Sequence, residues 1–249
     1  MHISISPEKL FEIGGVAITN AFLTNILVIV LIIVLSAIFY KKIKKVPGRF
    51  QALGEIVLEQ FMEFMDSFAG GRKNVRKFLP LVATIFFLVL ISNWIGTVPG
   101  IESIGYYMME DGHEVFVPFF RTANSDLNMT LALAIIVVIG SHLVGLKHLG
   151  RHHFDKFLVN PLKSPIGFFV GILEAIGEIS RIVSLTFRLF GNIFAGSVLM
   201  LIVTFLVPYV IPVPFLGLEL FVGFIQALVF AVLAMMFMAG STEAHHQEH

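Results

Sequence analysis

Residues 184–196, SLTFRLFGNIFAG, lie inside the apolar segment that decides how this chain folds. The segment runs over residues 165–207, and as one continuous α-helix it would be about 64 Å long at about 1.5 Å per residue. A hydrocarbon core of about 30 Å cannot hold such a helix upright. Either its first part lies outside the hydrocarbon or the helix is strongly tilted, and its polar residues favour the tilted helix.

The composition indicates an integral membrane protein. Hydrophobic residues make up 57% of the 249 residues and charged residues only 14%, which is far from the balance of a soluble domain. The 17 Lys and Arg equal the 17 Asp and Glu, so no excess of positive charge points to a nucleic-acid partner. The absence of cysteine excludes disulfides and thiolate metal sites. We expect no cofactor and no metal.

Five apolar segments are long enough to span a bilayer, and we expect them to form one membrane domain over residues 1–249. They are residues 21–40, 78–97, 127–146, 165–207 and 215–239. Charged residues at positions 8, 9 and 12 precede the first segment, and no small-residue cleavage site follows it. The N-terminal segment is therefore expected to be retained. The C-terminal STEAHHQEH is expected to be a solvated tail rather than a metal site.

Basic residues are distributed unevenly between the loops. Residues 41–77 carry nine Lys and Arg and residues 147–163 carry four, whereas residues 98–126 carry only Arg121 against five acidic residues. The positive-inside rule then predicts that the first and third loops are cytoplasmic. The N-terminus is expected outside and the C-terminus inside.

The first of these loops contains an amphipathic pattern over residues 50–68. Its apolar residues recur at helical spacing, and Glu55, Glu59 and Glu63 line another face. We expect a helix that either lies on the cytoplasmic membrane surface or packs beneath the other helices of the same chain.

Polar residues form one stripe along the 165–207 segment. At about 100° per residue, Glu174, Glu178, Arg181, Arg188 and Asn192 fall within a narrow sector. Each charge facing lipid would cost about 2.5 to 3.5 kcal/mol, so the stripe should face water or protein. A structural alternative is helix packing in which Arg188 pairs with one internal carboxylate.

The last segment repeats this pattern, because Glu219 and Gln226 are seven residues apart and hence share a face. A lone glutamine in a span is often a packing contact between helices. Its pairing with Glu219, opposite an arginine-bearing helix, favours a role in the same site.

Four motifs in order along the chain resemble the subunit a family of F-type ATP synthases. They are ISNWIGTVPG at 91–100, RTANSDLNMT at 121–130, RLFGNIFAG at 188–196 and FIQALVFAVL at 224–233. RLFGN followed by a downstream glutamine is the most specific of them. The resemblance covers essentially the whole chain.

The resemblance implies an all-α polytopic membrane protein whose last two helices form a long, tilted hairpin against a rotating ring of c subunits. Two half-channels would carry protons, or Na⁺, between the membrane faces and the ring. The subunit would bind no nucleotide, in keeping with the absence of a GxxxxGK(S/T) loop. The implied partners are the c ring, the b subunits of the peripheral stalk and the other synthase subunits. The short N-terminus without a transit sequence leads us to expect a bacterial plasma membrane.

The resemblance also assigns roles to individual residues. Arg188 matches the essential arginine, Gln226 the glutamine beside it, and Asn192 the asparagine of RLFGN. The external half-channel would use Asn192, Glu219 and Asp126, and the cytoplasmic one Glu174 and Ser184, with Glu178 beside them.

One position departs from the family pattern. Some members carry a glutamate where this chain has Ser197, and a histidine where it has Glu219. His142 either assists the external relay or is a packing histidine. The competing hypotheses are a self-contained ion transporter or antiporter, and a non-conducting membrane anchor.

Overall fold

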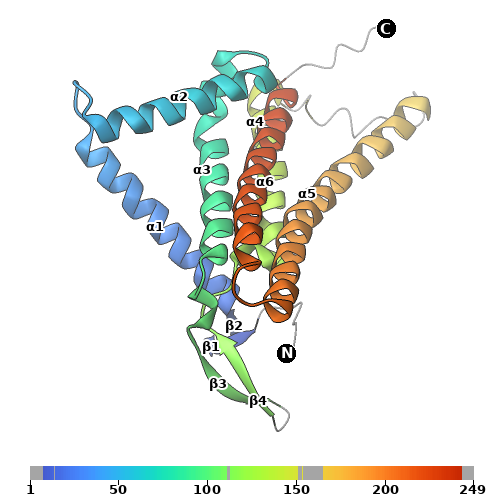
Figure 1. The fold of residues 1–249 in the computed structure, drawn as a ribbon. Helices are drawn as coiled ribbons and strands as arrows, with labels where there is room; N and C mark the ends of the chain where they lie inside the picture. Colours follow the sequence, from blue (N-terminus) through green and yellow to red (C-terminus); the bar gives the residue numbers. More distant parts are fainter. Residues whose placement is uncertain (1–7, 14, 111–112, 151–152, 154–164, 243–249) are drawn as a thin grey trace.

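The computed structural model describes residues 8–13, 15–110, 113–150, 153 and 165–242, and within them the chain is almost entirely helical (Figure 1). The helices are α1 (Asn20–Lys42), α2 (Arg49–Ala69), α3 (Arg72–Thr97), α4 (Leu127–Leu149), α5 (Pro165–Leu206) and α6 (Pro212–Gly240). All of them except α2 are long and apolar enough to cross a membrane. The predicted polytopic α-helical class is confirmed. The C-terminal histidines lie outside the described residues.

Helices α3, α4 and α6 form the packed centre of the molecule (Figure 1). The face of α6 that enters this core carries Ala227, Ala231 and Ala234, each fully buried. Small side chains let helix backbones approach closely, which is how membrane helices pack without a hydrophobic driving force between them. Valines at 75, 82 and 89 of α3 fill the opposite side of the contact.

Helix α2 crosses the end of the bundle and divides into two parts. Phe61, Met65 and Ala69, in its second half, are buried in the core, whereas Phe50 and Leu53, in its first half, are exposed. The second half therefore packs against the other helices of the chain, and the position of the first half on the membrane surface stays a prediction. The helix extends one residue further at each end than the predicted range 50–68.

Two β-hairpins lie at the end of the molecule opposite α2, and the sequence analysis did not foresee them (Figure 1). One pairs β1 (Lys9–Ile13) with β2 (Val16–Thr19), and the other pairs β3 (Gly105–Glu110) with β4 (His113–Pro118). The second hairpin lies in the predicted external loop, which was interpreted from its charges alone. Asn20 ties the two ends of this region together, because its Nδ2 donates to Glu8 Oε2 at 3.0 Å and to the Pro118 carbonyl at 3.3 Å.

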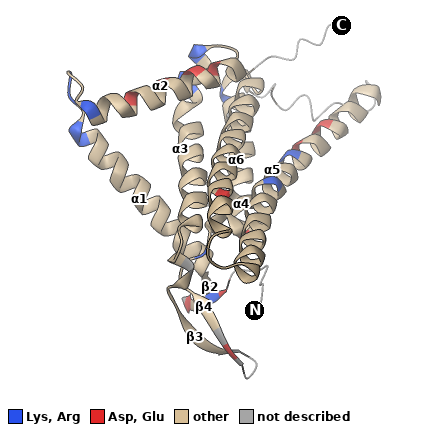
Figure 2. Ribbon diagram, in the orientation of Figure 1, with Lys and Arg blue, Asp and Glu red and all other residues tan. Residues whose placement is uncertain are grey.

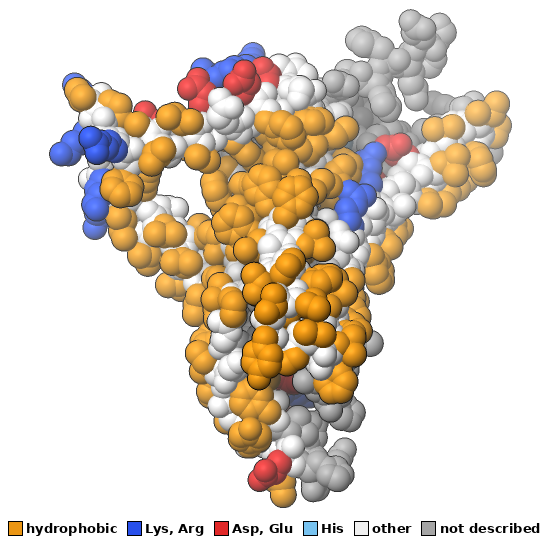
Figure 3. Space-filling view, in the orientation of Figure 1, with side chains coloured by type: hydrophobic (Ala, Val, Ile, Leu, Met, Phe, Trp, Pro, Cys, Tyr) orange, Lys and Arg blue, Asp and Glu red, His pale blue; other side chains and the backbone are white. Residues whose placement is uncertain are grey.

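Charged side chains gather at the ends of the molecule (Figure 2). Lys and Arg lie near both ends of α2, while α5 and α6 carry charged residues within apolar helices. Figure 3 shows the same contrast on the surface, where apolar side chains cover most of the visible face between these ends. The orientation in a membrane stays a prediction.

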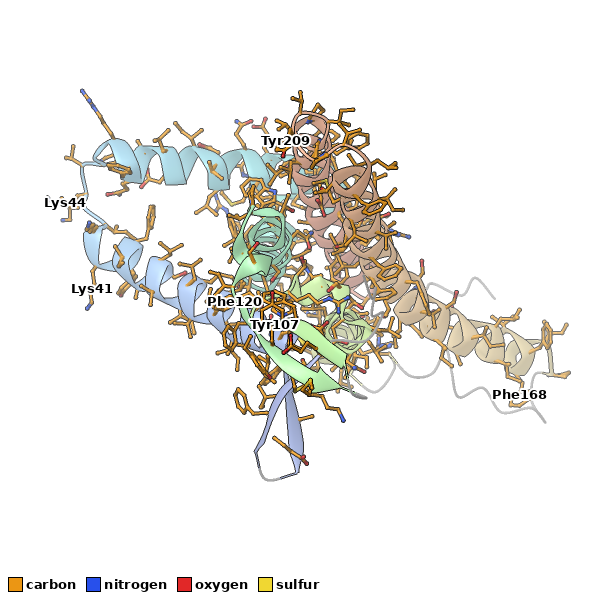
Figure 4. The ribbon with its side chains drawn as sticks, turned by 60° about the horizontal axis from the view of Figure 1, so that its bottom comes forward. Lys41, Lys44, Tyr107, Phe120, Phe168 and Tyr209 are labelled. Atoms are coloured by element: carbon orange, nitrogen blue, oxygen red, sulfur yellow. The ribbon has the colours of Figure 1, made fainter. Side chains whose placement is uncertain are left out.

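Helix α5 runs obliquely away from the bundle, so that its first turns lie far from α6 and its last turns lie beside it (Figure 1). Phe168, near its start, and Tyr209, in the turn after it, are at widely separated points of the molecule (Figure 4). Most apolar side chains of α5 are exposed, among them Ile166 and Phe169. The α5–α6 pair thus presents a long apolar surface with polar residues along it. Helix α6 begins at Pro212, three residues earlier than predicted, with the proline in its first turn.

Candidate functional site between α5 and α6

Arg188 is exposed on α5 and has a single hydrogen-bond partner within its own helix. Its Nη2 donates to Ser184 Oγ at 3.3 Å, one turn earlier. Among the described residues no carboxylate lies within ion-pair distance of the guanidinium. The described residues therefore provide no internal carboxylate for the alternative in which Arg188 is a paired packing residue. A permanent charge on an apolar helix remains without a counter-charge in the described part of this chain.

Asn192, one turn after Arg188, connects α5 to α6. Its Nδ2 donates to Gln226 Oε1 at 2.7 Å, and Gln226 is only 4% exposed. Gln226 Nε2 is buried with no hydrogen-bond partner among the described residues. The pair therefore fixes the glutamine beside the Arg188 turn while leaving one buried donor available.

Glu219 lies against α5 at Gly196, which makes room for it. A Cβ added at position 196 would lie 3.2 Å from Glu219 Oε1, tighter than an ordinary contact. The neighbouring Ser197 turns its hydroxyl back to donate to the Ile193 carbonyl at 3.0 Å. The carboxylate at this point of the α5–α6 interface thus comes from Glu219 on α6, and Ser197 on α5 contributes a hydroxyl.

Two buried asparagine side chains hold α6 in position one turn before Gln226. Asn93 Nδ2 donates to the Gly223 carbonyl at 3.1 Å, and Asn124 Nδ2 donates to Asn93 Oδ1 at 2.7 Å. The first asparagine belongs to the 91–100 motif and the second to the 121–130 motif. Both motifs therefore serve, at least in part, to hold α3 and the segment before α4 against α6. Each of these amides is buried, so the bonds form where water cannot replace them.

Asp126 lies in the same segment and caps α4. Its carboxylate accepts a hydrogen bond from the Asn128 backbone N–H at 2.9 Å, and the residue is 6% exposed. Helix N-caps of this kind satisfy otherwise unpaired backbone donors. Asp126 therefore has a structural role as the N-cap of α4. Its part in the external half-channel stays a prediction.

A second group of charges surrounds Glu178, ten residues before Arg188. Glu178 Oε1 accepts from Arg181 Nη1 at 2.8 Å, and Glu178 Oε2 lies 3.6 Å from His142 Nε2 on α4. His142 Nδ1 is in turn 3.0 Å from Nε2 of His153, which is 4% exposed. These residues and Glu174 line a cavity of about 280 Å³ between α4, α5 and the end of α6.

This position corrects the expectation for His142. Glu178, which it contacts, and Gly196, which contacts Glu219, are 18 residues apart on one continuous helix, or about 27 Å at 1.5 Å per residue. His142 is therefore too far from Glu219 to serve its relay directly. His153 was not predicted, since the His152–His153 pair in a basic loop carries no spacing that points to α4.

The comparisons with known proteins cover nearly the whole chain. Residues 22–239 match the ATP synthase A chain family. The chain belongs to that family. All nine predicted site residues lie within the matched range. Membership supports the subunit a hypothesis over a self-contained transporter.

Named relatives in the ATP synthase A chain family match this chain along most of their length. The ATP synthase subunit a of Trichlorobacter lovleyi is 35% identical over 246 residues, which cover 98% of this chain and 96% of the relative. That of Geobacter sulfurreducens is 34% identical over 244 residues, with 97% and 94% covered. That of Campylobacter jejuni strain RM1221 is 34% identical over 218 residues, with 87% of each covered.

Proposed function

We propose that this chain is the stator subunit that conducts protons between the two membrane faces and the carboxylates of a rotating c-subunit ring. The observation that carries the proposal is the exposed guanidinium of Arg188, which has no carboxylate partner in the described chain. A charge in an apolar helix is costly unless a partner or water faces it. A ring of subunits that each bring a carboxylate past α5 would supply that partner in turn.

In this mechanism Arg188 favours the deprotonated form of the arriving ring carboxylate by a direct charge interaction. A guanidinium does not lose its proton under these conditions, so it also repels protons that would otherwise cross directly from one half-channel to the other. A lysine would lack the planar guanidinium, and its ammonium group can lose its proton when it is buried. Gln226, held by Asn192, would hydrogen-bond the passing carboxylate through its available Nε2.

The two half-channels would approach Arg188 from opposite ends of α5. Glu174, Glu178 and Ser184 lie before Arg188 and would form the cytoplasmic path. Asn192 and Glu219, with Asp126 further out, would form the external path. The Glu178 turn lies about 15 Å before Arg188 along the helix and the Gly196 turn about 12 Å after it, at 1.5 Å per residue. This offset would oblige a proton to travel with the ring between the two paths.

The remaining expectations belong to the same proposal. The subunit would act with the c ring, the b subunits of the peripheral stalk and the other synthase subunits, and would itself bind no nucleotide. Protons are the proposed ion, and Na⁺ is the alternative because the ring would supply the ion ligands. The proposed location is a bacterial plasma membrane, with the N-terminus outside and the C-terminus cytoplasmic.

ATP-driven acidification of inverted membrane vesicles tests the proposal. Arg188→Ala should abolish acidification while the assembled complex still hydrolyses ATP. Arg72→Ala is the matched control, because Arg72 sits at the surface start of α3 in an exposed pair with Glu59 at 3.6 Å. Normal pumping by Arg188→Ala would contradict the proposal.

The passive proton permeability of the same vesicles tests the blocking role. It should rise in Arg188→Ala and stay unchanged in Arg72→Ala. Ion flux through the purified chain alone, in liposomes without other subunits, would instead support the self-contained transporter.

A further inference from the structure

The cavity beside Glu178 lies at the end of the bundle. Its lining includes Gly240 in the last turn of α6, Ser241 just beyond that helix, and His153 beyond the end of α4. Met236 and Phe237 supply an apolar wall. A volume of about 280 Å³ lined by charged and hydroxyl groups is large enough for several waters, at about 30 Å³ of liquid volume each.

Two histidines from different parts of the chain meet in this cavity. His142 Nδ1 lies 3.0 Å from His153 Nε2, a hydrogen-bond distance that requires one of the two nitrogens to carry the proton and the other to accept it. The contact is built into the fold, because a Cβ at Gly145, one turn after Ser141 on α4, would overlap the His153 ring. Only glycine at this position leaves room for His153 to reach His142.

The described lining of the cavity brings charges of both signs close to the histidine pair. Helix α5 faces it with Glu174, Glu178 and Arg181, α4 contributes Ser141, and the α6 side contributes only neutral groups. Two carboxylates and one guanidinium sum to a charge of −1. Glu178 Oε2 lies 3.6 Å from His142 Nε2, so a proton carried by the pair would have a carboxylate in contact with it.

We propose that His142 and His153 together form a single-proton binding site that collects protons from the aqueous phase and passes them to the water beside Glu178. This inference rests on the proposed function, and it adds two residues to the cytoplasmic path. Histidine suits the task because its ordinary protonation range spans neutral pH. Two rings joined by one hydrogen bond hold the extra proton as a unit rather than individually.

The transfer needs no oxidant and no leaving group. Hydronium at the outer side of the cavity gives one proton to the pair and becomes water. The pair gives one proton to a cavity water beside Glu178 and returns to its starting charge. In the reverse direction, which accompanies ATP synthesis, the same steps run backwards. His142, whose side chain is 24% exposed and contacts Glu178, is the member that meets the cavity water, and His153, which is 4% exposed, shares the proton through their hydrogen bond.

The test measures the initial rate of ATP-driven acidification in inverted vesicles as the pH of the medium is varied between about 6 and 8.5, around the protonation range of histidine. The variants are His142→Gln and His153→Gln, in which the amide keeps hydrogen bonding but cannot take up a proton. His148→Gln is the matched control, because His148 is an exposed histidine on α4 that contacts Lys77 and does not line the cavity.

Both cavity variants should pump at least about tenfold more slowly at the alkaline end of the range, and should approach wild-type rates at the acidic end. This loss is smaller than the 10²–10⁴ typical of general acid–base groups, because cavity water can still carry protons. His148→Gln should follow the wild-type curve throughout. Wild-type rates in both glutamine variants at every pH would show that the histidines only pack the cavity and would overturn the proposal.

Two further measurements keep the outcome decisive. If a variant does not assemble, ¹⁵N NMR of the histidine-labelled wild-type complex should show one cavity pair that takes up a single proton near neutral pH. Two rings that stay neutral down to about pH 5 would overturn the proposal. The Arg188→Ala variant distinguishes failure of this inference from failure of the proposed function. If it abolishes pumping while the cavity variants behave as wild type, only this inference fails, and if it pumps normally, the proposed function fails.

Discussion

Each half of α5 carries one arginine, and the two arginines differ in their contacts. In the first half, Arg181 forms an ion pair with Glu178 at 2.8 Å, and Glu178 also faces His142. In the second half, Arg188 is exposed with only the Ser184 hydroxyl as a partner. The two arginines are seven residues apart and hence about 20° apart around the helix, so their helical positions alone do not distinguish them.

The difference arises from what lies opposite each arginine. Around Glu178 the polar face of α5 meets α4, which places the His142 imidazole beside the Glu178–Arg181 ion pair. Around Arg188 no described carboxylate faces the guanidinium. Charges that are satisfied within a chain contribute to its own structure, whereas a charge left without a partner in a membrane helix indicates a surface that another molecule completes.

The largest expected effect comes from replacing each arginine by lysine. Arg188→Lys should abolish ATP-driven proton pumping, because an ammonium lacks the planar fork and loses its proton more readily when dehydrated. Arg181→Lys should retain most of the pumping, because a lysine can still pair with Glu178 at the cavity. Acidification rates, normalised to ATP hydrolysis, check both. Equal losses in the two variants would remove the distinction between the halves.

A bulky residue at Gly191 sharpens the same contrast. A Cβ at this position meets nothing within 4 Å, so Gly191→Leu should not destabilise the isolated chain. It should nevertheless reduce pumping severalfold if another backbone approaches here, since small residues permit such close contact. Gly191→Ser, which adds only a small side chain, is the control. Pumping that is unaffected by the leucine would argue that nothing packs closely against this turn.

The ion pair in the first half should matter for stability in an asymmetric way. Arg181→Met removes the ion-pair partner of the buried Glu178 carboxylate, and should lower the free energy of unfolding by about 1 to 3 kcal/mol. Glu178→Gln should cost less, because the partly exposed Arg181 can turn toward water. Thermal unfolding of the detergent-purified chain measures both. A larger loss in Glu178→Gln would contradict this account.

The smallest effect is expected at the amide pair of the second half. Asn192→Ala removes the partner of Gln226 Oε1 and leaves a buried amide unsatisfied, for a loss of about 1 kcal/mol. Gln226→Met keeps the volume and removes the buried polar group, and should cost less. The same unfolding measurement in detergent distinguishes them. Unfolding temperatures equal to that of the wild type in both variants would show that the hydrogen bond contributes nothing to stability.

Much of the fold follows from local sequence. The length of each apolar run predicts the spans, and the run at 165–207 differs by one residue from the observed α5. The hairpins at 9–19 and 105–118 were not predicted from the sequence. Short strands in a polar loop give only a weak periodic signal, and charged residues dominate the pattern of such a loop. The first half of α2 is exposed and the second is buried, although its amphipathic pattern is continuous.

The sequence by itself determined the spans, the polar face of α5 and the motifs that identify the family. These depend on the length and period of the chain, which are local properties. Only the tertiary structure decided that Arg181 is paired while Arg188 is not, that Glu219 lies at Gly196, and that His142 joins His153 rather than Glu219. Each of these depends on which helix lies opposite at a given height, and the oblique course of α5 changes that neighbour along its length.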